Sequence, residues 1–80
     1  EEFLFLLPDT ELDQAIVFSE RIRKTIAETS YTSNNTELNL TLTFGVSAIQ
    51  PGETAETVLK RADDALYEGK LTGRNCVVAK

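Results

Sequence analysis

The sequence of 80 residues contains no histidine and a single cysteine, and these two shortages limit the chemistry it can support. Without histidine there is no His/Cys set for zinc, and the commonest general base of enzymes is missing. Cys76 cannot form a disulfide within the chain, and in the apolar run of residues 76–79 we expect it to be a small core residue. Any catalysis must therefore depend on carboxylates, cations or a bound metal.

Long apolar runs and an excess of basic residues are also missing. No run approaches the ~20 residues of a transmembrane helix, so we expect no membrane insertion by this segment. Thirteen acidic and eight basic residues give a net charge of -5, which argues against a nucleic-acid partner but is compatible with one small basic pocket for a nucleotide. The acidic start, Glu1-Glu2, is unlike a signal peptide, and we expect a cytoplasmic location.

The first third of the chain predicts a strand followed by a helix. At this length residues 1–80 form at most one domain. The apolar run of residues 3–7, ended by Pro8, favours a strand covered on both faces. Apolar residues then recur at helical spacing, which predicts a helix over about 11–29 with Asp9 or Thr10 as its N-cap.

The rest of the chain predicts a strand, a second helix and a short closing strand. Residues 38–48 alternate between apolar and polar, as expected for a long strand, and Gly45 within it indicates a bulge or a close approach by another group. Before it, the polar stretch of residues 31–37 contains Asn34-Asn35, a candidate tight turn. Thr54 can cap a helix that Gly73 ends, and residues 75–79 close the fold. This order predicts an α+β sandwich of helices on a mostly antiparallel sheet.

Two clusters could carry chemistry. Glu1 and Glu2 precede the first strand, where carboxylates could hold a divalent cation such as magnesium, although the pair would also suit a solvated chain end. Lys70 and Arg74 surround the Gly73 turn and could clamp a phosphate tail, although cations at this place also stabilise a helix C-terminus.

Two further charged features carry less information. Lys60-Arg61 and Asp63-Asp64 stand in one helix, with Lys60 and Asp64 spaced as an i,i+4 pair, so we expect all four on a solvated face. Arg21, on the polar side of the first helix, indicates nothing by itself.

Together the motifs resemble the C-terminal half of a GGDEF domain, the module of diguanylate cyclases, beginning within its signature loop. Glu1-Glu2-Phe3 matches the end of the Gly-Gly-Asp/Glu-Glu-Phe loop. The other matching stretches, in the family's order, are residues 19–23, 40–47, 59–67 and 70–75. The resemblance covers essentially the whole chain, and the last two stretches are its most specific part.

The resemblance implies a nucleotide-cyclase-like fold, related to the ferredoxin-like sandwich, that works as a homodimer. Each domain would hold one GTP, and the 3′-hydroxyl of each GTP would attack the α-phosphate of the other, giving cyclic di-GMP and pyrophosphate. The implied cofactor is Mg²⁺ or Mn²⁺. A regulatory sensory domain would stand elsewhere in the parent chain.

The resemblance also assigns roles to individual residues. Glu1 matches the catalytic residue of the loop that binds the metal, and Glu2 matches its supporting neighbour. Lys70 and Arg74 match the cations that hold the GTP phosphates. Arg21 matches a residue that in some members binds product at an inhibitory site.

The sequence departs from the family pattern in several respects. Both loop glycines, the other metal-binding aspartate, the guanine-contacting residues and the upstream Arg-x-x-Asp motif are absent. Gly69 stands where we expect alanine, so the last turn before Lys70 should be looser. We therefore expect the isolated chain to be inactive and the parent to be a cyclase. The alternative is a degenerate domain that senses GTP or cyclic di-GMP or acts as a scaffold, and the residues upstream of Glu1 would decide between them.

Overall fold

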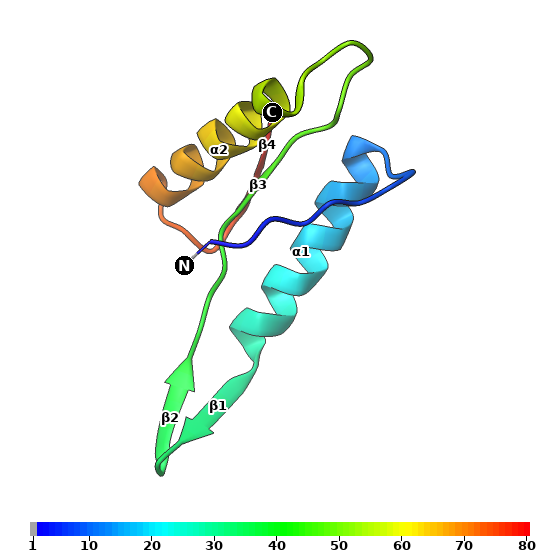
Figure 1. Ribbon diagram of the computed structural model, residues 1–80. Coiled ribbons are helices and arrows are strands. Elements are labelled where there is room, and N and C mark those ends of the chain that lie inside the picture. Colours follow the sequence, from blue (N-terminus) through cyan, green and yellow to red (C-terminus); the bar gives the residue numbers. More distant parts are fainter. Residues whose placement is uncertain (1) are drawn as a thin grey trace.

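The computed structural model describes residues 2–80, and within them the chain forms two helices and four short strands. In chain order these elements are α1 (Leu12–Glu28), β1 (Ser30–Ser33), β2 (Thr36–Asn39), β3 (Phe44–Val46), α2 (Ala55–Leu71) and β4 (Val77–Ala79). The strands form two separate pairs, β1 antiparallel to β2 and β3 parallel to β4. The predicted α+β class is confirmed, and both helices pack against the β3–β4 pair (Figure 1).

Helix α1 follows the predicted range within one residue at each end, but its N-cap is Glu11 rather than Asp9 or Thr10. The backbone N–H of Glu11 donates to Gln14 Oε1 at 3.0 Å, as in a capping box. Asp9 has a positive φ of 52°, and the Thr10 hydroxyl donates to the Pro8 carbonyl at 2.9 Å. Asp9 and Thr10, the two expected caps, thus belong to the turn that precedes the helix.

The predicted long strand over residues 38–48 is wrong, because its two ends pair with different partners. Its beginning lies in β2, which forms a hairpin with β1 through the predicted Asn34-Asn35 turn. Both turn residues have positive φ, at 51° and 64°, as a two-residue hairpin turn of this hand requires. The hairpin projects from the rest of the molecule (Figure 1). The other end of the segment forms β3, and residues 40–43 between them belong to neither pair.

Gly45 allows α2 to lie directly on β3. A Cβ at this position would stand 2.1 Å from the Ala62 carbonyl oxygen and 2.4 Å from the Leu66 nitrogen. Because both neighbours are backbone atoms of α2, no side-chain rearrangement could make room. The predicted close approach at Gly45 is confirmed.

Gly69 makes a second close contact, which corrects the expectation of a looser helix end. A Cβ there would lie 2.8 Å from Thr43 Cγ2 and 3.2 Å from Cys76 Sγ, so the glycine lets the last turns of α2 reach these neighbours. Cys76 is accordingly half-buried against the helix. The helix limits are otherwise as predicted: the Thr54 hydroxyl accepts from the Thr57 N–H, and Gly73 follows the last turn with a φ of 123°.

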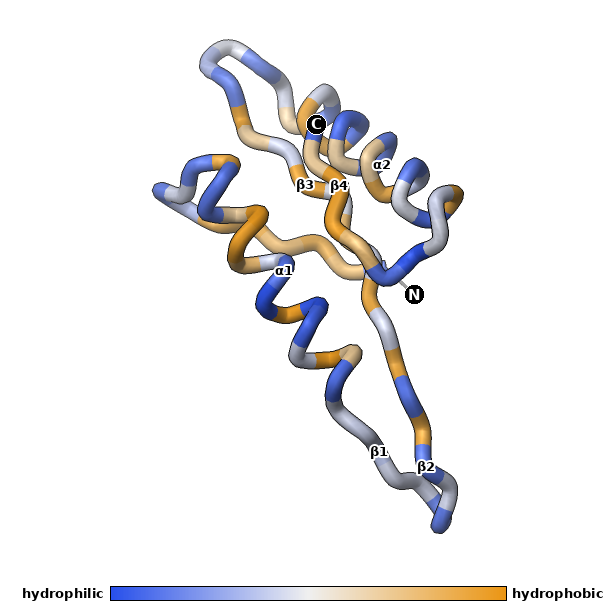
Figure 2. The backbone as a smooth tube through the Cα atoms, turned by 180° about the vertical axis from the view of Figure 1, so that it is seen from behind, coloured by the Kyte–Doolittle hydropathy of each residue, from blue (hydrophilic) through white to orange (hydrophobic). Residues whose placement is uncertain are grey.

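The predicted first strand over residues 3–7 does not form. The segment is extended but mostly exposed, with Phe3 at 79% and Leu6 at 75% of full exposure. A strand requires a neighbour for its N–H and C=O groups, and no strand within residues 2–80 pairs with it. Figure 2 shows this apolar segment running from near the β3–β4 pair across toward α1. Ala15 and Ala65 are the only buried hydrophobic residues in the described part of the chain.

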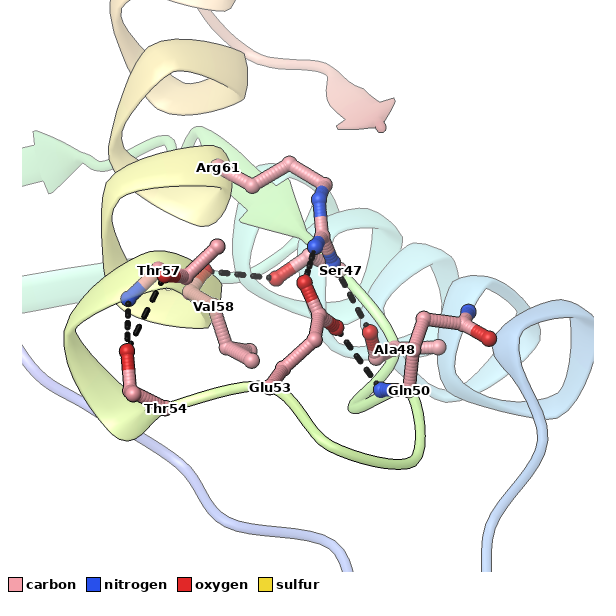
Figure 3. Close-up of polar contacts among 8 residues, drawn as sticks. All are labelled: Ser47, Ala48, Gln50, Glu53, Thr54, Thr57, Val58 and Arg61. Atoms are coloured by element: carbon pink, nitrogen blue, oxygen red, sulfur yellow. Dashed lines mark hydrogen bonds and ion pairs between the residues drawn. The ribbon is translucent and has the colours of Figure 1, made fainter.

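The loop between β3 and α2 is fixed by Arg61, which is not part of a solvated face (Figure 3). Its guanidinium donates to the Ala48 carbonyl at 2.9 Å and forms an ion pair with Glu53. Glu53 in turn accepts from the Gln50 N–H at 2.8 Å. The neighbouring Lys60–Asp64 pair forms on the exposed face as predicted, at 3.2 Å.

Neither of the two helices described in residues 2–80 is long and apolar enough to cross a bilayer.

Candidate functional site

The end of α2 and the beginning of the chain meet through Lys70 and Glu2. Lys70 lies in the last turn of the helix, and its Nζ is 2.9 Å from Glu2 Oε2. The hydrogen bond from Lys70, together with its positive charge, lowers the pKa of the Glu2 carboxyl below its ordinary value. The Lys70 side chain is one-third exposed, so the ammonium is screened on some sides and still accessible to a ligand.

A small pocket surrounds this ion pair. It is lined by Glu2, Asp63, Leu66, Tyr67 and Lys70 and has a volume of about 170 Å³. Pockets that enclose a drug-sized ligand have volumes of roughly 300–1,000 Å³. This pocket is smaller than that range, so residues 2–80 alone do not enclose a ligand of that size here.

Arg74 stands next to Lys70 because of the way α2 ends. Its backbone N–H donates to the Gly69 carbonyl at 2.9 Å, which is the 6→1 hydrogen bond of a Schellman motif around Gly73. Arg74 itself has a φ of 61°, and its side chain is exposed. The helix end thus brings the Arg74 backbone close to the turn that carries Lys70, with Glu2 beside the Lys70 ammonium.

Arg23 also reaches this place, and sequence reasoning missed it. Its Nη1 donates to Asn75 Oδ1 at 2.9 Å, and its Nε contacts both Glu20 carboxylate oxygens at 3.0 Å. The Glu20 carboxylate raises the pKa of the Arg23 guanidinium, and the hydrogen bond from Arg23 lowers the pKa of Glu20. Spacing in the sequence cannot distinguish Arg23 from other cations of α1, because its partner lies 52 residues away.

The remaining predicted site residues stay apart from this cluster or outside the description. Arg21 is exposed on α1 and makes no hydrogen bond or ion pair within residues 2–80. Glu1 lies outside the described residues. In the part of the chain that the structure describes, no three His, Cys, Asp or Glu residues gather as a metal centre. The metal site at Glu1 stays a prediction.

Comparison with known proteins identifies relatives over the whole chain. Residues 1–76 match the family model for the diguanylate cyclase GGDEF domain. The chain is 43% identical over 83 aligned residues to the response regulator PleD of Caulobacter vibrioides, and this covers all of the chain and 18% of PleD. It is 41% identical over 78 residues to diguanylate cyclase A of Treponema denticola, which covers 96% of the chain and 21% of that protein.

A solved structure has the same fold. The crystal structure of the GGDEF domain of DgcB from Caulobacter crescentus, in complex with c-di-GMP, superposes with a TM-score of 0.85 at 33% identity. The match covers 91% of this chain and 43% of that chain. The chain thus spans about a fifth of the length of these curated relatives and less than half of the solved domain.

Proposed function

Because the chain belongs to the GGDEF-domain family, we propose that residues 1–80 are the C-terminal part of one GGDEF domain in a diguanylate cyclase. The reaction joins two GTP molecules. The 3′-hydroxyl of each attacks the α-phosphate of the other, a P–O bond to pyrophosphate breaks at each attack, and the hydroxyl proton is released. The observation that carries the proposal is the gathering of Glu2, Lys70 and Arg74 at one end of α2.

Lys70 and Arg74 provide the charge that this reaction requires. Phosphoryl transfer is catalysed mainly by positioning and by neutralising the charge on the phosphate oxygens. Lys70 offers a compact ammonium, and Arg74 offers a planar fork that can bind two phosphate oxygens at once. Glu2 holds the Lys70 ammonium at 2.9 Å and so keeps it at the phosphate end of the site.

The donor chemistry at the start of the chain fits a divalent cation. Carboxylate oxygens are the ligands that Mg²⁺ prefers, and Mn²⁺ accepts them as well. Glu1 and Glu2 would supply them, with Glu1 as the metal ligand of the site and Glu2 in support. When bound, the ion would neutralise phosphate charge beside the two cations.

The exposed apolar surface favours the proposal that these residues belong to a larger domain. Phe3, Leu4, Phe5 and Leu6 are all more than half exposed, and they line an open groove that extends to α1, β3 and α2. Exposed apolar surface of this extent is typical of an interface. We assign it to the other part of the same GGDEF domain, which would also supply the second metal ligand and the guanine contacts.

The working unit is proposed to be a homodimer in the cytoplasm, where GTP is found, since each domain holds one of the two substrates. The small share of PleD that the chain spans leaves room for a regulatory sensory domain in the parent protein. The cyclic di-GMP in the DgcB structure supports product binding by the family, and the exposed Arg21 is the candidate contact for such a site here.

The proposal is tested with the purified full-length protein, GTP, and either Mg²⁺ or Mn²⁺. Chromatography should detect cyclic di-GMP and pyrophosphate, with neither product when the metal is chelated. Binding of GTP or cyclic di-GMP without any product would instead favour a sensor. A full-length protein that binds neither nucleotide and forms no product would overturn the proposal.

A further inference from the structure

The turn that carries Arg74 has an unfavourable backbone conformation. Arg74 and Asn75 have φ angles of 61° and 50°, so two consecutive residues with side chains occupy the left-handed region. This region is disfavoured for residues other than glycine, although asparagine tolerates it better than most. The turn keeps this shape only if its surroundings hold it.

Three contacts from three parts of the fold hold the turn. The Gly69 carbonyl of α2 accepts the Arg74 N–H at 2.9 Å, and the Thr43 hydroxyl before β3 accepts the Asn75 N–H at 3.0 Å. The third contact is the hydrogen bond from Arg23 Nη1 of α1 to Asn75 Oδ1. Of the three contacts, only the one with Arg23 involves a side chain of the turn, because the other two involve its backbone N–H groups.

Arg23 is itself fixed in place. Its Nε and Nη2 contact Glu20 on the preceding turn of α1, which leaves Nη1 directed at Asn75. Its side chain is 18% exposed, whereas Arg21 on the same helix is exposed and has no polar partner in residues 2–80. A cation that is largely covered and bound on both sides is poorly placed to bind a ligand directly, but well placed to orient a neighbour.

We propose that Arg23 is a positioning residue that acts through Asn75 to hold Arg74 where it binds the phosphates of the nucleotide. This rests on the proposed function, in which Arg74 is a phosphate ligand. Arg23 does not touch the nucleotide. It fixes the turn, so that the Arg74 fork meets the phosphate oxygens without the entropy cost of first ordering the loop.

The test uses the full-length protein and compares Arg23→Gln, Asn75→Gly and their double variant. Glycine at position 75 removes the acceptor and accepts the positive φ. Lys24→Gln is the matched control, an exposed cation next to Arg23 that does not contact the turn. Asn75→Asp keeps an acceptor oxygen toward Arg23 and is the conservative variant. The measurements are KM for GTP, kcat, the affinity for a nonhydrolysable GTP analogue, and the melting temperature.

If Arg23 positions Arg74, both single variants should raise KM and weaken analogue binding by about tenfold, because misplacing a binding group is costly. The double variant should be no worse than either single one, since both break the same contact. Lys24→Gln should bind the analogue like the wild type. Asn75→Asp keeps the contact with Arg23 but adds a negative charge next to Arg74, so it should bind the analogue more tightly than Asn75→Gly does. Should Arg23→Gln fail to fold, the comparison of Asn75→Gly with Asn75→Asp carries the test.

Three results would overturn the inference: single variants that bind the analogue normally, a lowered melting temperature with unchanged KM, or effects that multiply in the double variant. If the wild type makes cyclic di-GMP and Arg23→Gln matches it in activity and analogue binding, Arg23 has no positioning role and the proposed function still stands. A wild type whose analogue binding is weakened by Arg23→Gln, but which makes no product, keeps the positioning role and removes the proposed cyclase activity. No analogue binding by the wild type refutes both.

Discussion

Lys70 Nζ lies 2.9 Å from Glu2 Oε2, although 68 residues separate them along the chain. The contact joins the segment at the start of the chain to the last turn of α2, where Arg74 follows. Two motifs that are far apart in the sequence therefore meet in the fold, and a change in either should affect the other.

Replacing the cations proposed to bind phosphate should reduce turnover without unfolding the protein. In the full-length protein, Lys70→Gln and Arg74→Gln should each lower cyclic di-GMP formation by more than about tenfold, equivalent to about 1.4 kcal/mol in the barrier. Arg74→Lys should also be impaired, because it keeps the charge and loses the fork. Steady-state kinetics and melting temperatures measure both effects.

Lys60→Gln is the control for these variants, because Lys60 lies on the exposed face of the same helix and, within residues 2–80, forms an ion pair with Asp64 alone. That pair contributes a few tenths of a kcal/mol at most, so turnover should be unaffected. If all the Lys70 and Arg74 variants behaved like this control, the two cations would merely stabilise the helix end.

The Glu2–Lys70 contact should be visible in the titration of Glu2. The hydrogen bond and charge of Lys70 lower the pKa of the Glu2 carboxyl, so the folded protein holds the carboxylate more readily than the unfolded chain does. The contact therefore stabilises the fold above the ordinary glutamate pKa and is lost as the pH falls through the lowered value. NMR titration of the carboxyl carbon should show the lowered pKa.

Lys70→Gln should return the Glu2 pKa toward its ordinary value, while Lys60→Gln should leave it lowered. An ordinary pKa for Glu2 in the unmodified protein would mean that the ion pair does not persist in solution.

Substituting Gly45 should destabilise the domain severely. An alanine Cβ would meet backbone atoms of Ala62 and Leu66 at 2.1 and 2.4 Å, which forces α2 away from β3. Overpacking typically costs 1–3 kcal/mol, and we expect at least about 3 kcal/mol here, since backbone rather than side chains must move. Denaturant unfolding of the full-length protein measures the loss.

Gly52→Ala is the comparison for this variant. Its φ of 82° disfavours alanine, but nothing lies within 4 Å of the added Cβ. It should cost about 1 kcal/mol from the backbone alone. Equal losses at the two positions would show that α2 can shift away from Gly45 without difficulty.

The isolated chain of 80 residues should make no cyclic di-GMP and should self-associate. Phe3, Leu4, Phe5 and Leu6 are largely exposed, and Ala15 and Ala65 are the only buried hydrophobic residues in the described part. We therefore expect the apolar groove to bind a second copy of the chain. Sedimentation should show dimers or larger species, and chromatography should find GTP unchanged. A folded monomer at high concentration, or clear product, would contradict this expectation.

The local features of the fold could be predicted from sequence, because each depends on residues close together in the chain. Helical spacing and the Thr54 cap located both helices, and Asn34-Asn35 located a turn. The close approach at Gly45 was also predicted, since a glycine inside a strand pattern often marks a place where a neighbouring backbone comes near.

The failures concern partners that lie far away in the chain. Residues 3–7 have the composition of a buried strand but find no strand partner within residues 2–80. Residues 38–48 alternate between apolar and polar without interruption. Only the separate pairings with β1 and β4 split this segment into β2 and β3. In the site, Lys70 and Arg74 were identified through a known motif, whereas the contact of Arg23 with Asn75 crosses 52 residues and leaves no local trace.

The β1–β2 hairpin offers a practical point of attachment. Its Asn34-Asn35 tip is exposed and polar and lies at the far end of a projecting arm, away from helix α2 (Figure 1). Exposed loop tips of this kind tolerate insertions best. A fluorophore or short epitope placed there would report on assembly and nucleotide binding in the full-length protein while leaving the α2 end undisturbed.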